Sequence, residues 1–216
     1  MDDLSRDARD RLDPGAIARS ASLLLLAAVG TETASRMLEN GSSNLVRAHD
    51  LLLDILPYAS EFRYITTAAM AAAVLTFVVY ATRRTPAEVP HFISVIAIMY
   101  ALRAALIVLT PLAGPRTEEV AMFPLFANGM FPSGHTALAL LFVHFTDRAI
   151  APGLRRLQVA LTVTVIVMLL LSRGHYSIDI AGGALLAYFV AHEWTRGRLF
   201  ELLRRYVAGA PSRRRP

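Results

Sequence analysis

Residues 89–110 read VPHFISVIAIMYALRAALIVLT, an apolar run that contains a single formally charged side chain, Arg103. A helix of about 20 largely apolar residues is long enough to cross the hydrocarbon core of a bilayer. We therefore expect a transmembrane helix that ends at Pro111, because proline cannot continue a helix. Arg103 then lies about 10 Å below that end, too deep for a casual surface charge unless it snorkels or meets an anion.

The rest of the chain repeats this apolar pattern. Hydrophobic residues make up 55% of the sequence and charged residues 18%, a balance typical of membrane proteins. We predict an all-α, polytopic membrane protein with one domain over residues 1–216 and six transmembrane helices. The predicted spans are 17–37, 65–82, 89–110, 134–150, 157–172 and 178–194. Cysteine is absent from the sequence, which excludes a disulfide framework and a cysteine-ligated metal.

The basic residues, all of them arginine, indicate the orientation. They concentrate before the first span, between spans two and three, between spans four and five, and after span six. Cytoplasmic loops carry the excess of positive charge, so both termini are expected in the cytoplasm, with charged tails at 1–15 and 196–216. Arginines in short loops fit membrane topology better than nucleic-acid binding. Residues 50–58 are expected to form a short interfacial helix on the outer face.

Residues 128–136 read NGMFPSGHT and place a Ser-Gly-His at the outer start of the fourth span. Ser133 can cap the helix, and Gly134 allows a close approach of the backbone to a ligand. The free N–H groups and the positive end of the helix dipole favour an anion such as phosphate. His135 then stands beside the bound oxyanion. An ordinary Pro-Ser cap with a chance histidine is the alternative.

Residues 172–179 read SRGHYSID and lie at the start of the sixth span. The four-residue step from His175 to Asp179 puts both side chains on one helix face. Asp179 can accept the proton of one imidazole nitrogen, which leaves the other nitrogen free as a nucleophile. An acid inside a transmembrane segment is costly and therefore points to function. A His-Asp pair that only stabilises a helix end is the alternative.

A third group of polar residues lies on the third span. Tyr100, Arg103 and Thr110 fall on nearly one stripe, since seven residues close almost two helical turns. The predicted topology brings this stripe to the same face of the membrane as the other two motifs.

The three motifs resemble the signature of the type 2 phosphatidic acid phosphatase superfamily. Tyr100-x2-Arg103-x6-Thr110, Ser133-Gly134-His135-Thr136 and His175-Tyr176-Ser177-Ile178-Asp179 are similar to its sphingomyelin synthase branch. The motif-bearing part runs from about 100 to 194, and six helices agree with the architecture of that family.

The resemblance implies a two-step displacement in which His175 attacks phosphorus, Asp179 supports it, and His135 protonates the departing oxygen. It assigns phosphate binding to Arg103, Ser133, Gly134 and Arg173, and it makes Tyr100, Thr110, Asn128 and Tyr176 candidates to line the substrate. The implied partner is a lipid substrate within the bilayer, with no cofactor and no metal. The active site would face the extracytoplasmic side of a bacterial inner (plasma) membrane.

Two departures leave the acceptor open. The synthases carry Cys-Gly-Asp where this chain has Ala127, Asn128 and Gly129, and Pro132 gives the Pro-Ser-Gly-His form usual in the phosphatases. Only Gly174 separates Arg173 from His175, fewer residues than the phosphatases place there. Transfer of a head group to a lipid alcohol and hydrolysis of a phosphatidic acid type lipid therefore both remain. A transporter or scaffold is the non-enzyme alternative, but its charges should line a path through the midplane.

Overall fold

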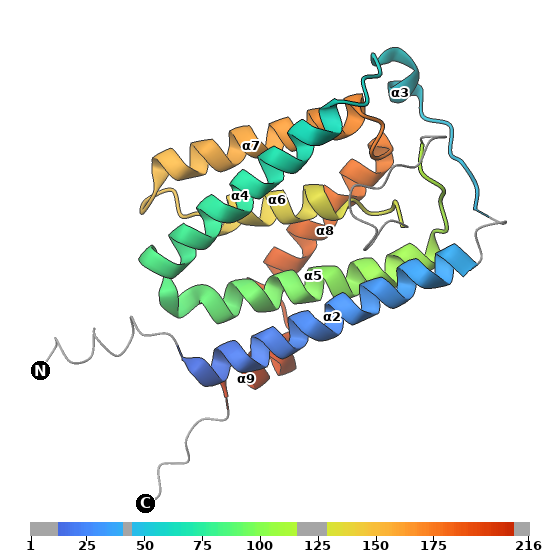
Figure 1. Cartoon of the computed structure of the whole chain (residues 1–216). Coiled ribbons are helices and arrows are strands. Elements are labelled where there is room, and N and C mark those ends of the chain that lie inside the picture. The colour runs from blue at the N-terminus through green and yellow to red at the C-terminus, as the bar shows by residue number, and fades with distance from the viewer. Residues whose placement is uncertain (1–12, 41–44, 116–128, 210–216) are drawn as a thin grey trace, which may run out of the picture.

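The computed structural model describes residues 13–40, 45–115 and 129–209, and every regular element within them is helical. The long helices run side by side, and the chain reverses direction between them (Figure 1). In chain order the elements are α2 (Pro14–Asn40), α3 (Leu51–Ile55), α4 (Phe62–Arg84), η2 (Pro86–Glu88), α5 (Val89–Leu109), α6 (Gly134–Phe145), α7 (Pro152–Leu171), α8 (Ser177–Thr195) and α9 (Glu201–Ala208).

All six predicted spans coincide with helices, but only four of these helices are long and apolar enough to cross a membrane. The four are α2, α4, α5 together with η2, and α7. Helix α6 ends at Phe145, five residues before the predicted end at position 150, and is a shorter apolar helix. Helix α8 carries Asp179 in its first turn. The expectation of six spans is therefore confirmed for four, and the side of the membrane on which the termini lie stays a prediction.

The packing of the helices places α6 and α8 in the middle of the bundle. Helix α5 lies along α2, α4 lies along α7, and α6 contacts both α7 and α8 (Figure 1). Buried polar groups join three of these helices. The Gln158 amide of α7 donates to the Ala73 carbonyl and the Thr76 hydroxyl of α4, each at 3.0 Å. Thr162 of α7 donates to the Ala139 carbonyl of α6 at 3.3 Å. Such hydrogen bonds hold helices together where apolar burial alone cannot, as in a bilayer.

An aromatic core fills the end of the bundle at which α4 passes into α5. Phe77 of α4 stacks on Phe142 of α6 with ring centroids 4.5 Å apart, and it meets Phe92 of α5 edge-on at 5.3 Å. The Trp194 indole N–H of α8 donates to the His91 ring. This core fixes α4 against the three helices that carry the predicted motifs, α5, α6 and α8.

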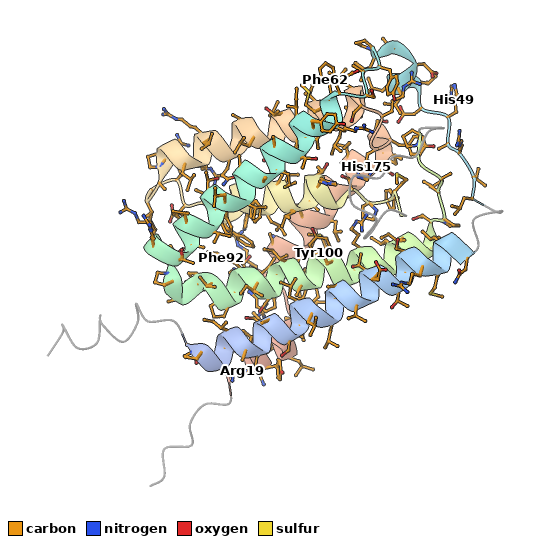
Figure 2. All side chains as sticks on the ribbon, viewed as in Figure 1. Arg19, His49, Phe62, Phe92, Tyr100 and His175 are labelled. Atoms are coloured by element: carbon orange, nitrogen blue, oxygen red, sulfur yellow. The ribbon has the colours of Figure 1, made fainter. Side chains whose placement is uncertain are left out.

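The two ends of the bundle differ in chemistry. One end of the bundle is formed by α3, by the starts of α4, α6 and α8, and by the end of α5. We call this end the "site end". Figure 2 shows His175 and His49 at the site end and Arg19 near the opposite end. The connections α4–α5 and α6–α7 lie at that opposite end, and they carry the exposed arginines Arg83, Arg84 and Arg148. The alternating pattern of arginines thus corresponds to two real ends of the molecule.

The segment after α8 is more ordered than the charged tail expected over 196–216. Helix α9 packs on α2, and its Val207 is buried. The Arg204 guanidinium donates to the carbonyls of Glu193, at 3.0 Å, and of Gly197, at 2.7 Å. These bonds tie α9 to the end of α8, where the Glu193 carbonyl also accepts the Gly197 N–H at 3.1 Å. The Arg19 guanidinium of α2 donates to the Val207 carbonyl at 2.9 Å.

Candidate active site

His175 lies in the turn between α7 and α8 and is paired with Asp179. Nδ1 of His175 and Oδ2 of Asp179 are 3.1 Å apart, and the same oxygen accepts the backbone N–H of Tyr176 at 2.9 Å. Asp179 is fully buried and His175 is 5% exposed. Since a carboxylate only accepts, the ring nitrogen facing it donates the proton, and Nε2 keeps a free lone pair. The four-residue step in the sequence thus gives the orientation that a nucleophilic histidine requires.

His135 stands opposite this pair, in the first turn of α6. The ring centroids of His135 and His175 are 6.1 Å apart and their planes are inclined at 66°. His135 is exposed, whereas His175 is buried. The separation is short enough for both imidazoles to contact one phosphoryl group, one as nucleophile and the other as proton donor.

Ser133 caps α6 and also joins it to α8. Its hydroxyl oxygen accepts the Thr136 N–H at 3.3 Å and the Thr136 hydroxyl at 3.1 Å. Its own N–H donates to the Asp179 carbonyl at 2.9 Å. That N–H is therefore engaged within the fold, and phosphate binding by Ser133 stays a prediction. The N–H groups of Gly134 and His135 precede the first bond of the helix, from Ala137 N–H to Ser133 O, and they point out of its positive end.

Arg103 reaches this site from α5, and two of its five N–H donors hold the backbone. Nε donates to the Pro132 carbonyl at 2.9 Å and Nη2 donates to the Gly129 carbonyl at 2.8 Å. Arg103 is buried, with 6% of the residue exposed. A Cβ at Gly134 would lie 3.1 Å from Nε, so the glycine leaves room for the guanidinium beneath the start of α6. Arg103 thus positions the Ser-Gly-His segment, and Nη1 is the nitrogen left to face an anion.

Residues 129–196 match the family model of the PAP2 superfamily C-terminal region. The matched segment contains both histidines, Asp179, Ser133 and Gly134, and it covers about a third of the chain. No curated protein matches the chain. The match supports the superfamily resemblance inferred from the motifs and suggests a phosphatase-type enzyme, and it does not extend to the synthase branch or to Arg103.

Within the matched segment, two glycines of α8 allow α6 and α8 to approach each other. A Cβ at Gly183 would lie 2.5 Å from the Ser133 carbonyl oxygen and 3.1 Å from Cβ of Thr136. A Cβ at Gly182 would collide with the Phe131 ring. Small residues at these positions therefore set the distance between α6 and α8, and hence that between His135 and His175.

Arg173 lies in the matched segment, and its side chain contacts α3. Its backbone is left-handed, with φ of 49°. Nη2 donates to the Leu53 carbonyl at 3.3 Å, and the guanidinium carbon stands 5.3 Å from the centroid of the Tyr58 ring. With only Gly174 between Arg173 and His175, the chain must turn sharply, which carries the arginine side chain to a separate cavity beside α3.

Three of the four predicted substrate-lining residues lie in the described part of the chain, and two of these use their hydroxyl groups within the fold. The Thr110 hydroxyl donates to the Leu106 carbonyl of its own helix at 2.6 Å, and the Tyr176 hydroxyl donates to the Ala113 carbonyl at 3.1 Å. Tyr176 is buried, and Tyr100 packs against the core. Asn128 lies outside the described residues. These contacts give Thr110 and Tyr176 structural roles, whatever they contribute to a substrate.

Asp50 is a site-end residue whose importance the sequence did not reveal. Oδ1 caps α3 by accepting the Leu52 N–H at 3.0 Å, and Oδ2 accepts the Ser177 N–H at 2.6 Å. Partial burial opposes its ionisation, but the bonds from Ser177, Leu52 and Leu53 prevail, so the pKa of Asp50 is lowered from 3.8. An aspartate just before a short helix signals a cap, but only the tertiary structure brings Ser177 to it.

Proposed function

We propose that the protein is a membrane phosphoesterase that acts on a lipid phosphate through a phosphohistidine on His175. The observation that carries this proposal is the pair of imidazoles 6.1 Å apart, of which one is oriented by a buried carboxylate and the other is exposed. A His-Asp pair that only stabilised a helix end would not require a second histidine facing it across a helix N-terminus.

In the first step, Nε2 of His175 attacks phosphorus, and the bond from phosphorus to the lipid oxygen breaks. His135 in its protonated form gives its proton to that oxygen, so the lipid leaves as a neutral alcohol. The imidazolium of His175 that forms is stabilised by Asp179, 3.1 Å from Nδ1. The Gly134 and His135 N–H groups at the start of α6 and the Nη1 group of Arg103 are placed to stabilise charge on the phosphoryl oxygens.

In the second step, an acceptor hydroxyl attacks the phosphohistidine and the bond from phosphorus to nitrogen breaks. His135, now neutral, takes the proton of the acceptor, which restores both histidines. Water as the acceptor releases inorganic phosphate. The Pro132-Ser133-Gly134-His135 form and the phosphatase-type PAP2 match favour water.

Transfer to a lipid alcohol, as in the sphingomyelin synthase branch, is the second candidate. The stripe Tyr100-x2-Arg103-x6-Thr110 and the Ser-Gly-His-Thr sequence favour it. Both routes share the first step, so they differ only in whether a lipid alcohol competes with water for the phosphohistidine.

One assay separates the two routes. Purified protein is incubated with phosphatidic acid labelled in its phosphate, and with phosphatidylcholine or phosphatidylethanolamine plus ceramide or diacylglycerol. Hydrolysis gives labelled inorganic phosphate from the first lipid, and transfer gives a new phospholipid from the mixtures. Absence of both products, with folding verified, contradicts the proposed function.

The arginine distribution supports an active site on the extracytoplasmic side of a bacterial inner membrane. Because the chain has no cysteine, single cysteines can report the topology directly. We expect a membrane-impermeant maleimide to label Ser60→Cys at the site end of intact cells, and not Ala149→Cys at the opposite end. The reverse pattern would overturn the orientation.

A further inference from the structure

A cavity of about 120 Å³ opens at the site end, beside α3 and apart from the two facing histidines. Its wall includes two guanidinium groups, one from Arg47 in the chain before α3 and one from Arg173 before α8. The complete lining is Arg47, Ala48, His49, Asp50, Leu53, Asp54, Pro115, Arg173 and Tyr176. We call this cavity the α3 pocket.

The two acidic residues of the α3 pocket are already occupied. Asp50 accepts the N–H groups of Ser177, at 2.6 Å, and of Leu52, at 3.0 Å. Asp54 pairs with Nε2 of His49 at 3.0 Å. Within the described parts of the chain, neither Arg47 nor Arg173 forms an ion pair with a carboxylate. The two arginines of the pocket are therefore not paired with its two carboxylates, whose oxygens already accept from Ser177, Leu52 and His49.

Arg173 carries a sign of an absent partner. Its Nε is buried and has no hydrogen-bond acceptor among the described residues, while Nη2 is held by the Leu53 carbonyl. Buried N–H groups of native proteins nearly always have a partner, and an oxyanion matches the paired donors of a guanidinium. The Tyr58 ring beneath the guanidinium keeps it in place without neutralising its charge.

Tyr176 connects the pocket to the candidate catalytic residues. Its side chain lines the pocket and its backbone N–H donates to Oδ2 of Asp179 at 2.9 Å. Arg173 precedes the predicted nucleophile His175 by two positions, so the same short segment carries both.

We propose that the α3 pocket is a second anion-binding subsite, which holds a phosphate or carboxylate of the substrate head group other than the phosphoryl group attacked by His175. This proposal rests on the proposed function and deepens it, because it favours lipids whose head group carries a second anionic group. Free inorganic phosphate has the same chemistry and is the other possible source of the anion.

The kinetic test compares two lipids with identical short acyl chains, phosphatidic acid and diacylglycerol pyrophosphate. Arg47→Gln should raise KM for diacylglycerol pyrophosphate about tenfold, which is the effect of losing one charged contact. The KM for phosphatidic acid should rise by a factor that is at least several-fold smaller. Arg47→Lys should recover part of the difference, and kcat should change little. Arg148→Gln, which removes an exposed arginine at the opposite end of the bundle, is the control and should behave as the unaltered protein.

The binding test does not depend on turnover. Calorimetry with the purified His175→Ala protein measures the affinity for inorganic pyrophosphate and for inorganic phosphate, with and without Arg47→Gln. If Arg47→Gln weakens the affinity for inorganic pyrophosphate about tenfold, the subsite is supported even if no lipid is turned over. If phosphate alone shows this dependence and the two lipids are not distinguished, the subsite belongs to free phosphate. If Arg47→Gln equals Arg148→Gln in both tests while lipid turnover persists, the subsite is wrong and the proposed function stands.

Discussion

The backbone N–H of Ser133 donates to the carbonyl oxygen of Asp179 at 2.9 Å. Each of these residues also performs the local role that its own helix start requires, Ser133 as the cap of α6 and Asp179 as the partner of His175. A single hydrogen bond therefore couples the segment that presents His135 to the pair that orients His175.

Replacement of His175 by alanine should abolish turnover, because no other group in the proposed scheme forms the covalent intermediate. Asp179→Asn should lower kcat about 10³- to 10⁴-fold, since an amide does not hold the imidazole in the required tautomer. Acid quenching with phosphate-labelled substrate should trap acid-labile label on the unaltered protein and none on His175→Ala. Label retained on the alanine variant would exclude His175 as the nucleophile.

Loss of His135 should depend on the leaving group. A lipid alkoxide needs a proton to depart, so His135→Ala should slow lipid phosphate turnover about 10²- to 10⁴-fold. p-Nitrophenolate departs without protonation, so formation of the phosphohistidine from p-nitrophenyl phosphate, measured as a burst of nitrophenol, should be much less affected. Equal losses on both substrates would contradict a proton-donor role for His135.

Arg103→Ala should reduce both stability and activity. The substitution leaves the buried carbonyls of Pro132 and Gly129 without the donors now at 2.9 and 2.8 Å, at a cost of about 3 kcal/mol. Thermal unfolding in detergent measures this loss, and Arg103→Lys should restore only part of it because a lysine cannot reproduce the fork. An unchanged Tm would show that Arg103 does not hold this segment.

Gly183→Leu should separate α6 from α8. A Cβ there would lie 2.5 Å from the Ser133 carbonyl oxygen, and overpacking of this kind costs about 1–3 kcal/mol. We expect a large loss of kcat, because the distance between His135 and His175 follows the helix separation. Ala181→Leu, at an exposed position of the same helix, is the control and should retain activity. A fully active Gly183→Leu protein would refute the spacing argument.

Asp50 should stabilise the protein in a pH-dependent way. Its pKa is lowered from 3.8 in the folded protein, so its charge contributes fully above that value and the contribution is lost as the pH falls through the folded pKa. Asp50→Asn should therefore lower Tm at pH 7, and the difference from the unaltered protein should narrow as the pH falls below 3.8. A difference that is constant with pH would mean that the Asp50 charge has no part in holding Ser177.

Several features of this protein depend only on residues that are close together in the sequence, and they could be predicted for that reason. Apolar runs long enough to cross a bilayer gave the positions of the long helices. The four-residue step from His175 to Asp179 gave their contact, since neighbours on a helix face depend only on helix geometry. The Ser133 cap followed from residue type and position.

The errors and gaps concern contacts between distant segments. Helix α6 ends early at Phe145, and residues 201–208 fold into α9 on α2, because tertiary packing and not hydropathy sets these limits. Arg103 uses two of its nitrogens on backbone carbonyls, and Arg173 turns to α3. Side-chain direction at such positions depends on which partner the fold brings near.

The sequence by itself therefore determined the helices, the His-Asp pair and the anion-favouring start of α6, because each follows from periodicity or from neighbours within one turn. Only the tertiary structure decided that His135 faces His175, that Asp50 reaches Ser177, and that Arg47 and Arg173 share a pocket. These relations join segments far apart in the chain. They depend on how closely α6 and α8 pack at Gly183, a distance that no local pattern encodes.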